Sequence, residues 1–416
     1  MIARKKLCIL LLCVLSGLLP LRAPAQALLR RDPVEDEQTA RAHWEQLMSE
    51  SEAARRGGDY EAARKSCEKA VALCRNFPRP DTHLAQSQVQ MGNIYLSERK
   101  PEVAEPLFKE AIRNCELAVG PQHPLLIIPL ESLANGYYMK NRYDQVAEVY
   151  QRILAITEHG VVMQNLEVGR RSRNLADAYF SQKEYTRAEP LYLRAIALAD
   201  PSGDINAMVE FRLSAGHLYE TINRPEAAAE KYKQAADLSD GVKNDFMTFQ
   251  ALQSLTQVWR NSGHYEPAEA AAQRAVALRE KSAAAAEADN DRRLDLAVSL
   301  ANLAQVYLAW DKAERAESLY RRSVEIVDQA GAPGNNEAVA HRLGLATAER
   351  KLGKLSEAEK QYKDALVLLE AHGGSDPAQM IALLDDYATV MQALNKSKDA
   401  EALRARAEAL RKTQSR

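Results

Sequence analysis

The stretch that decides the fold is NLADAYFSQKEYTRAEPLYLRAIAL, residues 174–198. It contains two short amphipathic helical patterns with a polar break between them. Small and large residues recur at fixed places: Ala176 and Tyr179 in the first helix, Ala188 and Tyr192 in the second. Residues three or four apart share a helical face, so two helices can cross at the alanines while the tyrosines fill the space beside the crossing. The stretch predicts a helix–turn–helix unit.

The same template recurs along nearly the whole chain. The residues equivalent to Ala188 are Ala63, Ala104, Val146, Ala188, Ala228, Ala268, Ala316, Ala358 and Ala400. Successive members are 40 to 48 residues apart, and a period of this size indicates an array of stacked units. We therefore expect nine units. The 48-residue step separates units six and seven, where an alanine run at 283–286 predicts a longer second helix in unit six.

Three stretches carry a resemblance to a known family: LANGYYMKNRYDQVAEVYQRIL (133–154), NLADAYFSQKEYTRAEPLYLRAI (174–196) and NLAQVYLAWDKAERAESLYRRSV (302–324). They resemble the tetratricopeptide repeat, and more closely its 42-residue form found in kinesin light chains. The resemblance implies an all-α, right-handed α-solenoid of about nine helix–turn–helix repeats over residues 38–411, with a polar tail at 412–416.

The N-terminus has the pattern of a secretory signal peptide. Arg4, Lys5 and Lys6 precede an apolar run at 7–19, and a small-x-small site follows near Ala25. We predict a signal peptide at residues 1–25, a polar leader at 26–37 and a periplasmic or secreted protein. The apolar run is short of the length that spans a bilayer, and no later stretch is apolar enough to span one after cleavage.

The residues give no sign of an enzyme. The eight histidines are scattered, no two have the spacing of a helical metal pair, and no metalloprotease, P-loop or hydrolase motif occurs. We therefore expect a non-catalytic protein with no cofactor and no metal. The formal net charge of −2 also disfavours a nucleic-acid partner.

Three cysteines remain after the signal peptide: Cys67, Cys74 and Cys115. Cys74 and Cys115 occupy the same template position in neighbouring repeats, so an exported protein could bridge them. The alternative, two partly buried thiols, is favoured by the narrow range of Cα distances that a disulfide accepts.

In tetratricopeptide arrays the first helix of each repeat lines a concave groove, and the resemblance implies partner contacts there. Transferred by register, the candidates are Asn93, Asn135, Tyr138, Arg170, Arg173, Asp177, Phe180, His217 and Gln257. We expect Tyr138 and Phe180 to be apolar anchors and Arg170 with Arg173 to hold a carboxylate. The competing interpretation is that these are ordinary solvated residues, with the two aromatic rings packed on neighbouring helices.

We therefore predict an exported scaffold that binds a peptide or helix of another protein in its groove. The alternative is a structural subunit that forms homo-oligomers through its more apolar C-terminal repeats, where the groove positions include Val298, Leu308 and Leu343. A third interpretation, a binder of small molecules or cell-wall material, has no pocket signature in the sequence.

Overall fold

The computed structural model describes residues 33–74, 77–78, 81–159, 165–284, 290–330, 336–371 and 377–414. The predicted signal peptide lies outside these ranges. Within them the chain forms eighteen α-helices and two short 3-10 helices, with no strand. The all-α prediction is confirmed.

The helices alternate as the first and second members of nine pairs. The pairs are α1 (Pro33–Arg56) and α2 (Tyr60–Leu73), α3 (His83–Ser97) and α4 (Pro101–Val119), α5 (Ile127–Met139) and α6 (Tyr143–His159), α7 (Asn165–Ser181) and α8 (Tyr185–Ala199), α9 (Ile205–Thr221) and α10 (Pro225–Gly241), α11 (Asp245–Asn261) and α12 (Tyr265–Ala283), α13 (Asn290–Ala309) and α14 (Ala313–Gln329), α15 (Asn336–Lys351) and α16 (Leu355–Ala371), and α17 (Pro377–Ala393) and α18 (Ser397–Gln414). The 3-10 helices are Pro124–Leu126 and Asp200–Ser202.

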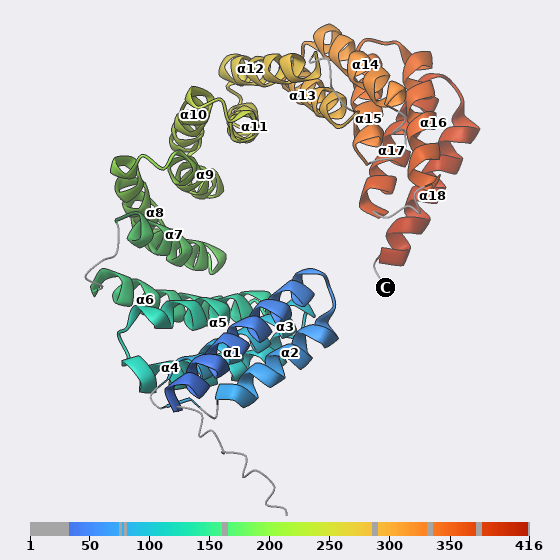
Figure 1. Ribbon diagram of the computed structural model, residues 1–416. Helices are drawn as coiled ribbons and strands as arrows, with labels where there is room; N and C mark the ends of the chain where they lie inside the picture. Colours follow the sequence, from blue (N-terminus) through green and yellow to red (C-terminus); the bar gives the residue numbers. More distant parts are fainter. Residues whose placement is uncertain are drawn as a thin grey trace, which may run out of the picture.

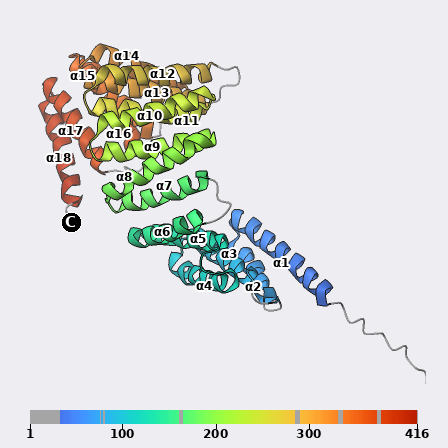
Figure 2. The same ribbon diagram turned by 90° about the vertical axis from the view of Figure 1, so that its left-hand side faces the viewer.

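The pairs stack into a curved α-solenoid. Each helix packs on the next along the chain. In the described chain, helices that pack extensively against one another belong to the same repeat or to adjacent repeats. Figure 1 shows the curve, with α9, α11 and α13 on its inner side, and Figure 2 shows the pairs as successive layers. First helices also contact first helices of adjacent repeats, as α7 does α9. The inner, concave face is therefore built by the first helices.

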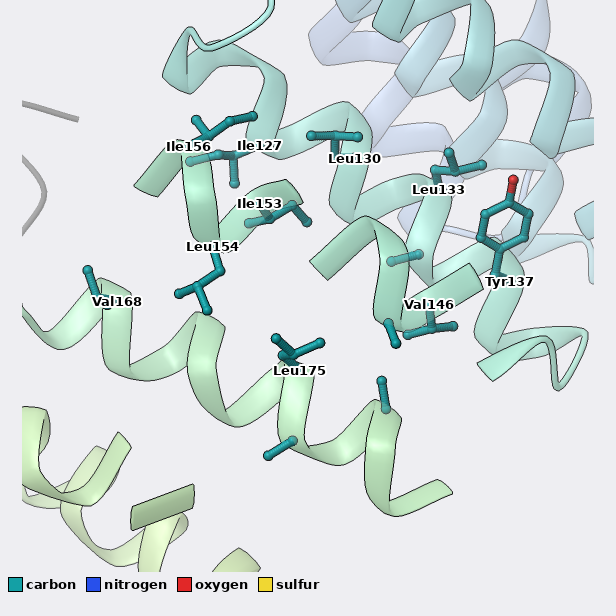
Figure 3. Close-up of a cluster of buried hydrophobic side chains, with 14 of the residues drawn as sticks. Ile127, Leu130, Leu133, Tyr137, Val146, Ile153, Leu154, Ile156, Val168 and Leu175 are labelled. Carbon is teal, nitrogen blue, oxygen red and sulfur yellow. The ribbon is translucent and has the colours of Figure 1, made fainter. Parts of the chain in front are cut away.

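The crossing points of the template are buried. Eight of the nine anchor residues are alanines with 0% exposure, and Val146, the ninth, is 2% exposed. Large residues fill the space between them, and Figure 3 shows this for the third and fourth repeats, where Ile153 and Leu154 of α6 lie between side chains of α5 and α7. The core is thus one slice per repeat, continued by the neighbours.

The two helices of each pair are joined by the same type of turn. Five residues before each anchor, one residue has a left-handed conformation: Gly58, Arg99, Asn141, Lys183, Asn223, Gly263, Asp311, Gly353 and Asn395. At Lys183 the backbone N–H donates to the Phe180 carbonyl, and the Glu184 N–H donates to that of Tyr179, both at 2.9 Å. These two bonds satisfy carbonyls at the end of the first helix. The turn therefore keeps the same register in all nine repeats.

Three boundaries differ from the predictions. Helix α1 begins at Pro33, inside the predicted leader, because proline suits the first helical position. Helix α12 ends at Ala283, before the end of the alanine run, and α13 begins at Asn290 and has 20 residues. Helix α18 runs to Gln414, so part of the predicted tail is helical.

Candidate functional site

Five of the predicted groove residues line one pocket. It has a volume of about 400 Å³ and lies on the inner face where repeats three, four and five meet. The five are Asn135, Tyr138, Asp177, Phe180 and His217. They come from α5, α7 and α9, so the register transferred from the sequence brings together side chains up to 82 residues apart. We call this the Asp177 pocket.

Aromatic rings form the walls of the Asp177 pocket. The Tyr138 side chain is 53% exposed although it is large and apolar over most of its surface. Its ring meets Tyr143 edge to face at 5.4 Å between centroids, a contact that restricts the orientation of the ring. The Phe180 ring lies 5.1 Å from His217 and 5.6 Å from Tyr185, and is partly buried against the core. Tyr138 is thus the freer of the two predicted anchors.

A carboxylate lies at the base of the pocket. The Tyr192 hydroxyl donates to Asp177 Oδ1 at 2.6 Å, and Arg173 Nε lies 3.2 Å from Asp177 Oδ2. The Asp177 side chain lines the pocket and is 39% exposed. This partial burial raises the pKa of Asp177, and the nearby Arg173 and the Tyr192 hydrogen bond offset the rise only in part.

The two predicted arginines are engaged within the chain. Arg170 Nη2 lies 2.9 Å from Asp204 Oδ2, and Arg173 Nη2 lies 2.7 Å from Glu210 Oε1. Neither lines the Asp177 pocket. The two arginines are therefore not free to bind a carboxylate of a partner protein together, because each guanidinium already has a carboxylate partner from its own or the next repeat.

A second pocket adjoins the first along the groove. It has a volume of about 540 Å³, shares His217 with the Asp177 pocket, and includes the predicted Gln257 of α11. It also contains Glu220, whose Oε2 accepts a hydrogen bond of 3.0 Å from the Tyr232 hydroxyl. We call this the Glu220 pocket. The two pockets make a continuous run across repeats three to six.

The remaining predicted residues lie apart. Asn93 lines a separate pocket of about 270 Å³ between repeats two and three, beside Leu125 and Ile128. Cys115 also lines it and is a free thiol, as are Cys67 and Cys74, so the Cys74–Cys115 bridge is not formed. The Cys74 thiol instead donates to the Ala70 carbonyl of its own helix at 3.2 Å, and burial raises the pKa of both Cys74 and Cys115.

Sequence reasoning missed the tyrosines at the base of the two pockets. Tyr192 and Tyr232 stand four residues after an anchor alanine and are only 3% exposed, as expected of residues that fill the core. Their hydroxyls nevertheless reach carboxylates on the first helix of the same repeat. The signal was present: a tyrosine, unlike a phenylalanine, needs a hydrogen-bond partner when it is buried.

Comparison with known proteins agrees with the geometry. A family model described as tetratricopeptide repeat matches residues 46–117 and 83–159, and a second model of the same description matches residues 173–199. The chain contains tetratricopeptide repeats.

A curated relative is the Arabidopsis thaliana "Protein KINESIN LIGHT CHAIN-RELATED 1". It is 20% identical over 326 residues, which are 76% of this chain and 52% of the relative. The chain thus spans about half the length of that protein.

The chain is also similar to solved structures. The apo form of RapI superposes with a TM-score of 0.51 at 13% identity, covering 79% of this chain and 99% of RapI. A Podosopora anserina putative kinesin light chain with nearly identical repeats gives 0.44 at 15% identity, covering 50% and 99%. The likeness to RapI concerns the fold alone.

Within the described residues the structure has no candidate metal site and no candidate membrane span. No group of three or more His, Cys, Asp or Glu side chains there is placed to hold a metal ion. No helix in the same ranges is long and apolar enough to cross a membrane.

Proposed function

We propose that this tetratricopeptide-repeat chain is an exported, non-catalytic scaffold that binds an extended segment of another protein along its concave face. The observation that carries the proposal is the pair of adjoining pockets across repeats three to six. A segment that lies along the groove passes from the Asp177 pocket to the Glu220 pocket over His217, the residue common to both.

The side chains of this run suit an extended peptide. Such a segment must satisfy backbone N–H and C=O groups that no secondary structure satisfies, and side-chain amides both donate and accept. Asn135 and Asn174 supply amides at the first pocket, and Gln250 and Gln257 at the second. The exposed ring of Tyr138 offers an apolar contact of the kind that dominates binding energy at interfaces.

Site-specific photocrosslinking tests the binding site. A photoreactive phenylalanine analogue replaces Tyr138 or His217, and a matched control places it at Leu193, which is 42% exposed on the outer helix α8. We expect covalent adducts with one protein from positions 138 and 217 and none from 193. Adducts from 193 alone would contradict binding in the groove.

The export part of the proposal rests on residues 1–25. The order of positive, apolar and small-x-small segments supports cleavage near Ala25 and a periplasmic or secreted location. N-terminal sequencing of the protein from secreting cells should give a start near residue 26. A start at Met1 in exported material would overturn cleavage, and recovery only from the cytosol would overturn export.

Self-association through the C-terminal repeats stays a prediction without a specific supporting observation. Val298, Leu308 and Leu343 are half-buried, and the last two pack against the core of their own repeats. In the described chain, nine of the ten exposed large apolar side chains precede residue 250, and the remaining one is Val367. The apolar groove positions of the C-terminal half are therefore used mainly for packing between helices.

A further inference from the structure

We infer that the groove selects a partner segment carrying lysine or arginine side chains, which enter the Asp177 and Glu220 pockets. This inference rests on the proposed function and specifies the chemistry of the partner. It reverses the expectation drawn from Arg170 and Arg173, which pointed to an acidic partner.

The balance of charge along the groove carries the inference. The arginines of α7 are engaged: Arg170 with Asp204, Arg171 with Glu131 at 3.1 Å, and Arg173 with Glu210. In the described structure Glu220 has a hydrogen bond from Tyr232 and no cationic partner. Asp177 shares its one cation, Arg173, with the closer Glu210. The arginines are thus already paired, whereas Glu220 has no cation beside it and Asp177 has only a shared one, so the two pockets carry an excess of negative charge.

The form of the Asp177 pocket suits a cation on a long apolar stem. A lysine or arginine side chain pairs an apolar stem with a charged head, and aromatic faces attract such a head through the ring quadrupole. Tyr138 and Phe180 supply rings in the wall, and Asp177 supplies the opposite charge at the base. The hydroxyls of Tyr192 and Tyr232 donate to the two carboxylates and so hold them in place without neutralising them.

Burial of Asp177 supports the same assignment. Partial removal from water raises its pKa, so the ionised form is electrostatically under-compensated in the unbound protein. A cation that enters the pocket relieves this, whereas an acidic side chain would increase the repulsion.

Peptide binding to the full protein tests the inference. The probes are three fluorescent unstructured peptides of equal length that differ only at two positions: two arginines, two citrullines as neutral analogues, or two glutamates. We expect the arginine peptide to bind at least about tenfold more tightly than the citrulline peptide, and the glutamate peptide to bind most weakly.

Two variants remove the charges while keeping shape and hydrogen bonds. In Asp177→Asn and Glu220→Gln the amide oxygen still accepts from the tyrosine hydroxyl, and Arg173 keeps Glu210, so the fold is retained. Each should weaken the arginine peptide about tenfold and leave the citrulline peptide unchanged. Glu226→Gln, an exposed position of the outer helix α10, is the matched control and should have no effect.

The outcomes separate this inference from the proposed function. Equal binding of all three peptides, lost in Tyr138→Ser, would overturn the preference for cations while leaving peptide binding in the groove. Arginine amide competing as strongly as the whole peptide would overturn the extended partner in favour of a small cation. Failure of every peptide to bind at millimolar concentration would overturn both.

Discussion

At the scale of single residues, the groove depends on helix positions where no side chain fits. In α9, Gly216 faces the Tyr232 ring so closely that a Cβ built on it would lie 2.5 Å from Tyr232 Cε1. The Tyr232 ring lies in this gap, and its hydroxyl passes beyond it to Glu220. One missing methyl group therefore positions both a core ring and a groove carboxylate.

The substitution Gly216→Ala should destabilise the fifth repeat. Alanine gains up to about 1 kcal/mol of helix propensity over glycine, but overpacking a well-filled core costs about 1–3 kcal/mol, so the steric cost wins. Urea unfolding followed by circular dichroism should show a lower midpoint. The matched control is Gly241→Ala at the end of α10, where a Cβ meets nothing within 4 Å, and which should be neutral or slightly stabilising. A urea midpoint for Gly216→Ala at or above that of the control would show that the Tyr232 ring can move aside without loss of stability.

At the scale of helices, a glutamate directly after the buried anchor joins repeats two, four, seven and eight each to the repeat that follows. Glu105 Oε2 lies 3.0 Å from Lys140 Nζ and 2.9 Å from Arg142 Nη1. The same contact recurs as Glu189 with Arg224, Glu317 with Lys354 and Glu359 with Lys396. These pairs join a second helix to the turn of the following repeat, and so fix the angle between repeats that shapes the groove.

The pairing of Glu105 predicts a loss of stability in acid. Burial alone would raise its pKa, but hydrogen bonds from Lys109 and Lys140 outweigh burial and lower the pKa from 4.5 to about 2. A carboxyl with a lowered folded-state pKa stabilises the fold above its unfolded pKa, and this contribution is lost as the pH falls from about 4.5 towards 2. At 1.36 kcal/mol per pKa unit, this contribution is on the order of 3 kcal/mol.

The variant Glu105→Gln should therefore unfold more easily at pH 7, and its difference from the wild type should shrink towards pH 2. Urea midpoints across this range measure the effect. Glu102→Gln, on an outward position of the same helix, is the control and should follow the wild type at each pH. A constant difference between Glu105→Gln and the wild type at all pH values would mean that packing, and not charge, is responsible.

Much of the fold and part of the site could be predicted at this scale. The anchor series located all nine crossings because small residues recur where helices touch, and the register placed Asn135, Asp177 and His217 at one pocket. The pairing of charges could not be predicted, because the sequence does not distinguish a surface carboxylate that is solvated by water from one that pairs with a cation of the next repeat. The Ala–Glu pairs at 104–105, 188–189, 316–317 and 358–359 nevertheless share one template place, and this regularity was a usable signal.

At the scale of the whole molecule, stability comes from contacts between neighbouring repeats. One buried cluster runs from α3 to α9, and the clusters that follow share partly buried residues with it or with each other, as Ile222 and Trp259 do. A solenoid of this kind is stabilised locally, so a defect at one end should not spread far along the array. Repeats three to six, which line the groove, lie in the middle of the array, with further repeats stacked on either side of them (Figure 1).

Removal of α18 tests this locality. Its residues Ala400 and Ala407 have 0% exposure and pack against α17, where they cover Tyr387 and Leu384. A chain ending at residue 396 loses these contacts, and uncovering several apolar side chains at about 1–2 kcal/mol each should open the ninth repeat and loosen the eighth. Hydrogen exchange should accelerate in α15 to α17 while α5 to α10 keep their protection, since local opening follows cooperative units. A chain ending at residue 411, which retains Ala407 and Leu410, is the control and should exchange as the full protein does. Faster exchange throughout the array in the shorter chain would show that the repeats unfold as one unit, and would contradict a stability built from neighbour contacts.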